Sequence, residues 1–162
     1  LGCASDPGLV IFSVRRRCPR PRGIAGRRVV TAMVLQASEY LVVPQACENP
    51  RLRLVCFPHS GGGPAAFASW PEQLDQRRVE VVSVSLPGRE RRVDLEPLMH
   101  WEVIVEDICN ALQASELVDD VPYAFFGHSL GALLAFEVAR RLDGVLPPSR
   151  PRPIHLFASG HG

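Results

Sequence analysis

The sequence of 162 residues contains no lysine, and all eighteen of its basic residues are arginines. A Walker A phosphate loop requires a lysine, so this absence excludes that class of nucleotide-binding site. The formal net charge of +1 at pH 7 gives no bulk attraction to nucleic acid or to a membrane surface. We therefore expect neither a nucleic acid nor a membrane among the partners of this protein.

Long apolar runs and paired cysteines are also missing. No run approaches the roughly 18 residues that a transmembrane helix needs. The five cysteines are odd in number, widely spaced and form no Cys-x-x-Cys pair. A disulfide framework and a zinc site are therefore not expected, and nothing indicates another metal or a cofactor. This cysteine pattern favours a reducing cytoplasm.

Residues 1–32 differ in composition from the rest of the chain. They hold seven arginines against the single acid Asp6, whereas residues 33–162 hold eleven arginines against sixteen acids. Prolines and glycines punctuate the stretch, which shows no sustained apolar period. We predict that residues 1–32 are disordered or an upstream extension before a true start at Met33, and that residues 33–162 form the folded part. A less favoured alternative is a short secretory signal around Arg27-Arg28.

Apolar segments of strand length alternate with segments of helical period from residue 52 onward. Strands are predicted over 52–57, 79–84, 123–126 and 154–158, and helices over 65–74, 99–117 and 130–142. The alternation predicts an α/β fold, with a mostly parallel sheet and helices on both faces. The last helix is apolar almost all round, which favours a place in the interior, packed under the sheet.

The motif that carries chemistry is Gly127-His128-Ser129-Leu130-Gly131, which fits Gly-x-Ser-x-Gly. A predicted strand runs straight into it and a predicted helix leaves it, as a nucleophile elbow requires. Side chains at Gly127 and Gly131 would collide with the neighbouring strand and helix. The pattern indicates that Ser129 is a nucleophile at a helix N-terminus, where unpaired N–H groups stabilise an oxyanion. The flanking strand and helix disfavour a chance match in a loop.

A second motif follows the first predicted strand, where Gly61, Gly62 and Gly63 form a run. An oxyanion hole in this kind of fold takes one N–H from the residue after the nucleophile, here Leu130, and one from the loop after an early strand. Glycines let that backbone approach the substrate oxygen. The alternatives are plain turn glycines or a dinucleotide loop, but the spacing does not supply Gly-x-Gly-x-x-Gly.

Histidines and arginines carry weaker signals. His128 adjoins the serine, but on so sharp a turn its side chain is expected to point away from the serine oxygen and to be structural. His161 is a minor candidate for a catalytic base. Arg89, Arg91 and Arg92 form a cluster that is typical of a solvated loop and that could also meet an acidic partner.

The order and spacing of four segments resemble a type II thioesterase of polyketide and non-ribosomal peptide pathways, a branch of the α/β-hydrolase superfamily. The resemblance runs from about Leu52 to the end of the sequence. The segments are Phe57-Pro58 with Ser60-Gly61-Gly62, Leu86-Pro87-Gly88-Arg89, residues 127–132 with Phe136-Glu137-Val138-Ala139, and Leu156-Phe157-Ala158-Ser159-Gly160. Such a family member is an editing hydrolase, which removes stalled or wrong acyl groups from the phosphopantetheine arm of an acyl or peptidyl carrier protein.

This resemblance also implies roles for individual residues. Ser129 would attack the thioester and form an acyl-enzyme that water then hydrolyses. Ser60 and Leu130 would supply the two oxyanion N–H groups. Because carrier proteins are usually acidic, the arginine cluster becomes a candidate docking edge. Members of the family are cytoplasmic and need no metal or cofactor.

One departure concerns the catalytic triad, which runs Ser, then Asp or Glu, then His along the chain. No Asp follows Asp143, and only His155 and His161 follow it. We expect the sequence to be part of a longer enzyme, with the triad acid and histidine, the C-terminal strands and the lid absent. Such a chain is expected to turn over little or nothing, with an open sheet edge and uncovered apolar faces.

Three other functions remain open. An esterase or lipase of the same fold would use Ser129 in the same way. A non-catalytic module or pseudoenzyme would bind acyl carriers without forming an acyl-enzyme. A thioesterase domain fused to a carrier is disfavoured, because residues 1–32 resemble neither a carrier domain nor a clean linker.

Overall fold

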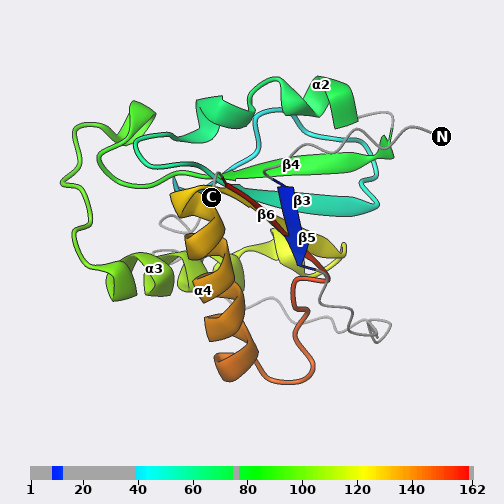
Figure 1. Cartoon of the computed structure of the whole chain (residues 1–162). Coiled ribbons are helices and arrows are strands. Elements are labelled where there is room, and N and C mark those ends of the chain that lie inside the picture. Colours follow the sequence, from blue (N-terminus) through cyan, green and yellow to red (C-terminus); the bar gives the residue numbers. More distant parts are fainter. Residues whose placement is uncertain (1–8, 13–38, 75–76, 161–162) are drawn as a thin grey trace.

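A computed structural model describes residues 9–12, 39–74 and 77–160. They form one six-stranded sheet in the order β1-β6-β5-β3-β4-β2 (Figure 1). The strands are β1 (Leu9–Phe12), β2 (Leu41–Val42), β3 (Leu52–Phe57), β4 (Val79–Val84), β5 (Tyr123–His128) and β6 (Leu156–Ser159). The four central strands run parallel, and β1 and β2 pair antiparallel at the two edges. The prediction of a mostly parallel sheet is therefore confirmed.

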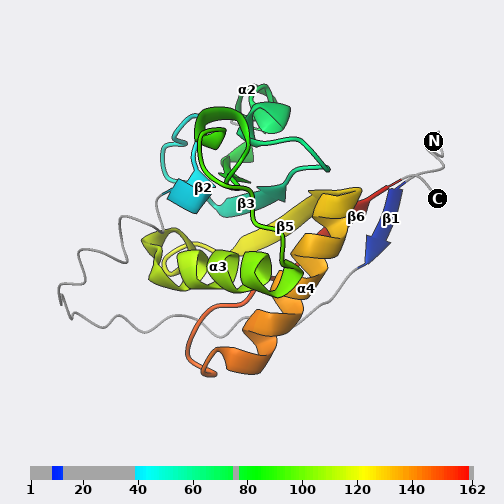
Figure 2. The same cartoon turned by 90° about the vertical axis from the view of Figure 1, so that its left-hand side faces the viewer.

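Helices cover both faces of this sheet, as the sequence predicts. Helix α2 (Trp70–Leu74) lies on one face, and α3 (Trp101–Ala114) and α4 (Leu130–Val145) lie on the other (Figure 2). Short 3₁₀ helices are η1 (Pro64–Phe67), η3 (Glu90–Arg92) and η4 (Glu116–Val118). The single helix predicted over 65–74 is thus two short pieces, η1 and α2. In the described part of the chain, no helix is long and apolar enough to cross a membrane.

Alternate residues of the central strands face two separate apolar clusters. In β3, Val55 and Phe57 pack toward α3 and α4, whereas Leu54 and Cys56 pack toward η1 and α2. Successive side chains of a strand point to opposite faces, so a strand covered on both sides is apolar at nearly every position. This burial explains why β3 and β4 are mostly apolar in the sequence, with Arg53, Glu80 and Ser83 as the exceptions.

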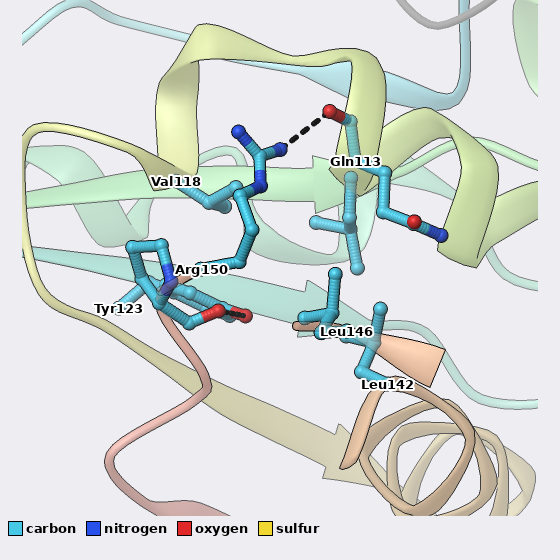
Figure 3. A pocket seen from close by; sticks show the side chains of 8 residues that line it. Gln113, Val118, Tyr123, Leu142, Leu146 and Arg150 are labelled. Atoms are coloured by element: carbon cyan, nitrogen blue, oxygen red, sulfur yellow. Dashed lines mark hydrogen bonds between the residues drawn. The ribbon is translucent and has the colours of Figure 1, made fainter. Parts of the chain in front are cut away.

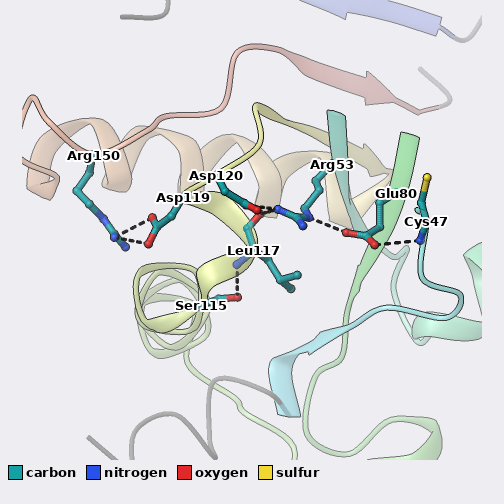
Figure 4. A network of polar contacts seen from close by, with 8 residues as sticks. All are labelled: Cys47, Arg53, Glu80, Ser115, Leu117, Asp119, Asp120 and Arg150. Carbon is teal, nitrogen blue, oxygen red and sulfur yellow. Dashed lines mark hydrogen bonds and ion pairs between the residues drawn. The ribbon is translucent and has the colours of Figure 1, made fainter. Parts of the chain in front are cut away.

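An ion-pair network closes the sheet at the amino ends of β3 and β4 (Figure 4). The Arg53 guanidinium donates to Glu80 Oε2 at 2.6 Å and to Asp120 Oδ1 at 2.6 Å, and also to the Leu117 carbonyl at 2.8 Å. The second Glu80 oxygen accepts from the Cys47 N–H at 3.1 Å. Because the Arg53 and Glu80 side chains are only 11% and 7% exposed, these bonds satisfy charges that would otherwise be buried alone.

The same end of the molecule holds a small cavity among α3, α4 and β5 (Figure 3). Arg150 closes it by donating to the Gln113 carbonyl at 2.6 Å and to the Asp119 carboxylate at 2.8 Å. The Tyr123 hydroxyl donates to the Pro151 carbonyl at 3.3 Å beside it. The space of about 10 Å³ among these residues has room for no more than about one water molecule, so this cavity is too small for a substrate.

Strand β1 lies within residues 1–32, the stretch that was predicted to be disordered or an upstream extension. Leu9–Phe12 pairs antiparallel with β6, in the register Leu9 with Ser159 through Phe12 with Leu156. Four consecutive apolar residues suit a strand, and their pairing covers the edge of β6 that was expected to be open. The rest of that stretch, the proposed start at Met33 and the possible signal segment lie outside the described residues.

Helix α4 corrects the prediction of a fully interior helix. Leu133 and Phe136 are 61% and 53% exposed. The buried side of α4 is a single stripe, made of Gly131, Leu134, Ala135, Val138 and Leu142. The helix therefore covers the sheet with one face and leaves apolar side chains exposed on its other face.

Candidate active site

Ser129 occupies the sharp turn between β5 and α4. Its backbone has φ 54° and ψ −121°, a conformation that residues other than glycine rarely adopt. Its N–H donates to the Ser159 carbonyl at the end of β6, at 2.7 Å. The residue is exposed at the carboxyl end of the sheet. This strained and exposed placement is the geometry of a nucleophile elbow.

The two flanking glycines permit this turn. A Cβ on Gly127 would meet the backbone of Gly131 and Ala132 at the start of α4. A Cβ on Gly131 would meet the carbonyl oxygens of Phe57 and Pro58 at the end of β3. The collisions expected from the sequence are therefore present at both positions, one with the helix and one with the end of a strand.

The glycine run after β3 forms a tight turn beside the elbow. The Gly62 N–H donates to the His59 carbonyl at 3.0 Å, and Gly61 has φ 80°, as the third residue of a type II turn requires. The His59 ring covers Gly62 and lies 6.3 Å from the His128 ring, centroid to centroid. Ser60 is exposed at the tip of this turn.

Two N–H groups at this end of the sheet are available to a ligand. Within the described residues, no acceptor bonds the N–H of Ser60 or that of Leu130. Leu130 is the first residue of α4, where helix geometry leaves the N–H without an intrahelical partner. The packing of Gly131 against Phe57 and Pro58 holds the glycine turn next to this helix start. The two donors therefore belong to neighbouring segments at this end of the sheet.

His128 is held by the neighbouring strand. Its Nδ1 lies 3.1 Å from Ser159 Oγ, within hydrogen-bond distance. Ser159 thus contacts two residues of the elbow: its hydroxyl contacts His128, and its carbonyl accepts from the Ser129 N–H. No role was predicted for Ser159 itself, although a serine at the end of a strand parallel to β5 can reach the elbow. His155 packs against Phe157, and His161 lies outside the described residues.

The arginine cluster does not form one exposed edge, which corrects that prediction for Arg92. The Arg92 side chain is only 13% exposed, donates to the Ser85 carbonyl at 2.9 Å and lies 4.5 Å from the centroid of the Tyr40 ring. It therefore packs the loop against the sheet. Arg91 is exposed and Arg89 is half-buried, so these two remain candidates for contact with a partner.

The buried cysteines are poor nucleophiles. Burial raises the pKa of the Cys56 thiol far above its usual range and raises that of Cys109 to about 11. Both thiols stay protonated at neutral pH, and a thiol reacts as its thiolate. Neither buried cysteine is therefore a candidate nucleophile.

Comparison with known proteins agrees with this geometry. The family model described as thioesterase domain matches residues 52–161. The gramicidin S biosynthesis protein GrsT of Aneurinibacillus migulanus is 38% identical over 127 residues, which are 78% of this chain and 47% of that protein.

Solved structures of thioesterases are similar as well. RedJ, from the prodiginine biosynthetic pathway in Streptomyces coelicolor, is 40% identical with a TM-score of 0.61, over 85% of this chain and 44% of that one. The type II thioesterase BorB of the borrelidin biosynthetic cluster is 32% identical with a TM-score of 0.59, over 66% of this chain and 42% of that one. The chain spans less than half the length of each of these three proteins. Because the family match covers most of the chain, this protein belongs to the thioesterase domain family, in the α/β-hydrolase fold.

Proposed function

We propose that this protein hydrolyses acyl thioesters on the phosphopantetheine arm of an acyl or peptidyl carrier protein, as an editing type II thioesterase. The observation that carries the proposal is Ser129, an exposed serine held at φ 54° between β5 and α4. The similarity to GrsT, RedJ and BorB, whose names place them in gramicidin S, prodiginine and borrelidin biosynthesis, supports this substrate class.

The reaction begins when Ser129 Oγ attacks the thioester carbonyl carbon. The carbonyl oxygen becomes an oxyanion, which the N–H groups of Leu130 and Ser60 stabilise. The C–S bond then breaks, the pantetheine sulfur leaves as a thiol, and an acyl-serine ester remains. Water attacks that ester and releases the free acid. In this fold a histidine oriented by a carboxylate carries the protons, and none of the described histidines is assigned that role.

The carrier protein would dock near the loop after β4. Arg91 is exposed and Arg89 half-exposed there, and an acidic carrier surface complements both charges. The loop also contacts η1, just after the glycine turn, through Glu90. It follows the carboxyl end of β4 as Ser129 follows that of the parallel strand β5, which supports docking at this end of the sheet. We place this reaction in the cytoplasm, where buried free thiols such as Cys56 and Cys109 persist.

Hydrolysis assays on matched substrates test the proposal. The protein from its native source is given an acyl-pantetheine thioester and the corresponding oxygen ester, beside Ser129→Ala and the control Ser69→Ala. We expect release of the acid from the thioester, its loss in Ser129→Ala, and no change in Ser69→Ala, because Ser69 lies exposed in a turn before α2. Faster hydrolysis of the oxygen ester would favour an esterase or lipase. Carrier binding without hydrolysis would favour a non-catalytic module.

A further inference from the structure

Glu90 is strained and reaches across to the glycine turn. It has φ 43°, in the left-handed region, although it is not glycine. Both carboxylate oxygens lie within hydrogen-bond distance of the Ala65 N–H, at 3.2 and 3.1 Å. Ala65 belongs to η1, which follows directly on the glycine run. A residue in this conformation persists only when its surroundings enforce it, and such residues cluster at functional sites.

The packing between Glu90 and the glycine run leaves no room for a side chain. A Cβ on Gly63 would lie 2.6 Å from Glu90 Cδ and 2.8 Å from Oε1. A side chain at position 63 would therefore displace this carboxylate from its present place. Among the described residues, Glu90 supplies the side-chain hydrogen bonds that reach the segment between β3 and α2.

The backbone around Glu90 is itself anchored. The Gly88 N–H donates to the Arg92 carbonyl at 2.9 Å, and the Val93 N–H donates to the Glu90 carbonyl at 3.2 Å. Arg92 in turn donates to the Ser85 carbonyl just beyond β4. Glu90 thus connects a loop fixed to β4 with the turn that follows β3, across 25 residues of sequence.

We propose that Glu90 is a positioning residue for the oxyanion hole. By holding Ala65 and packing on Gly63, its carboxylate fixes the turn so that the Ser60 N–H faces the same oxygen as the Leu130 N–H. This inference rests on the proposed function, because it assigns Glu90 to the oxyanion donors of that reaction. Donor placement acts on the transition state more than on substrate binding, so it affects kcat more than KM.

Kinetics of three variants test the inference. Loss of a whole oxyanion donor costs about 10²–10³ in kcat, and a loosened donor costs less. We expect Glu90→Ala to lower kcat about tenfold with KM within about twofold. Glu90→Gln keeps an oxygen that accepts from the Ala65 N–H and retains part of the rate. The matched control Glu72→Ala, which removes an exposed carboxylate of α2, leaves both constants unchanged.

Amide hydrogen exchange over residues 60–66 gives a readout that needs no turnover. We expect faster exchange of Ala65 in Glu90→Ala and unchanged exchange in Glu72→Ala. Unchanged exchange in Glu90→Ala overturns the inference, and so does faster exchange with an unaltered kcat, since the contact would then be structural only. A wild-type protein that hydrolyses no thioester refutes the proposed function instead, and the exchange result still decides whether Glu90 holds the turn.

Discussion

The two ends of the central sheet differ in whether their polar groups are paired and buried or exposed. At the amino ends of β3 and β4, Arg53 bonds Glu80 and Asp120, and two of these side chains are nearly buried. At the carboxyl ends, Ser129 is strained and exposed, and Ser60 sits exposed on a glycine turn. Satisfied polar groups contribute to stability, whereas available donors and an exposed hydroxyl can meet a substrate. The amino end therefore holds polar groups that stabilise the fold, and the carboxyl end holds the candidate reactive groups.

The largest effect is expected at the amino end, for Arg53→Met. This change leaves the Glu80 carboxylate buried without its partner, so we expect the free energy of unfolding to fall by about 3–5 kcal/mol. The same substitution at Arg140 is the control, because Arg140 is 68% exposed and pairs with Glu137 on the surface of α4. There the loss is expected to stay below about 0.5 kcal/mol. Urea unfolding measures both, and equal losses would remove the contrast between the two ends.

A smaller loss is expected at the reactive end for Gly131→Ala. The new methyl group would press on the carbonyls of Phe57 and Pro58, and such overpacking costs about 1–3 kcal/mol. Gly144→Ala is a control in the same helix, because a Cβ there meets no atom within 4 Å. Alanine suits a helix better than glycine, so this variant gains up to about 1 kcal/mol. A stable Gly131→Ala protein, judged by thermal unfolding, would contradict the close approach of α4 to β3.

Ser159→Ala is expected to have a modest effect. It removes the partner of His128 Nδ1 but keeps the carbonyl that accepts from the Ser129 N–H. Loss of one such hydrogen bond costs about 1 kcal/mol of stability. With the proposed mechanism, kcat falls a few-fold and KM stays constant, because the turn loosens without losing a substrate contact. Ser149→Ala, at an exposed loop position, is the comparison. An unchanged kcat in Ser159→Ala would mean that Ser159 contributes to stability only.

The least disruptive test titrates the two tyrosines, one at each end of the sheet. Burial and a 2.7 Å hydrogen bond to Asp107 raise the pKa of Tyr40 to about 12, and burial raises that of Tyr123 as well. Unfolded tyrosines lose their protons near about pH 10. The free energy of unfolding therefore falls as the pH rises from about 10 to about 12, because only the unfolded chain ionises there.

The ultraviolet absorbance of tyrosinate measures this difference between native and urea-unfolded protein. Tyr40→Phe leaves Tyr123 as the single reporter of the amino end. If the tyrosines of the native protein lose their protons at the same pH as those of the unfolded protein, the burial of Tyr40 and Tyr123 is contradicted.

The parts of the fold that were predicted correctly have a local signal. Most positions of β3 and β4 are apolar because both faces are covered, and the elbow is a pentapeptide between a strand and a helix. The two-residue strand β2 and the edge strand β1 carry too short a pattern to be predicted by period alone. Because α4 is apolar almost all round in sequence, its composition does not indicate which side the sheet covers. The exposure of Leu133 and Phe136 was therefore not predicted.

The parts of the candidate site that could be predicted are those whose residues are close together in the sequence. The glycine run and the residues of the elbow follow from motif spacing, and their catalytic roles remain predictions. The contacts of Glu90 with Ala65 and of Ser159 with His128 join segments 25 and 31 residues apart. Such contacts depend on how loops meet at the end of the sheet, and no local pattern specifies that. The same reason accounts for Arg92, whose inward contacts distinguish it from Arg91.

Trapping of the acyl-enzyme is the most direct test of whether Ser129 is the nucleophile. The protein is mixed with an acyl-pantetheine thioester, quenched in acid within the first turnover, and examined by intact and peptide mass spectrometry. If Ser129 is the nucleophile, we expect a mass increase equal to the acyl group, located on the peptide that contains Ser129 and absent from Ser129→Ala. An acyl group on another residue, or undiminished acid release by Ser129→Ala, would contradict the assignment of Ser129 as the nucleophile.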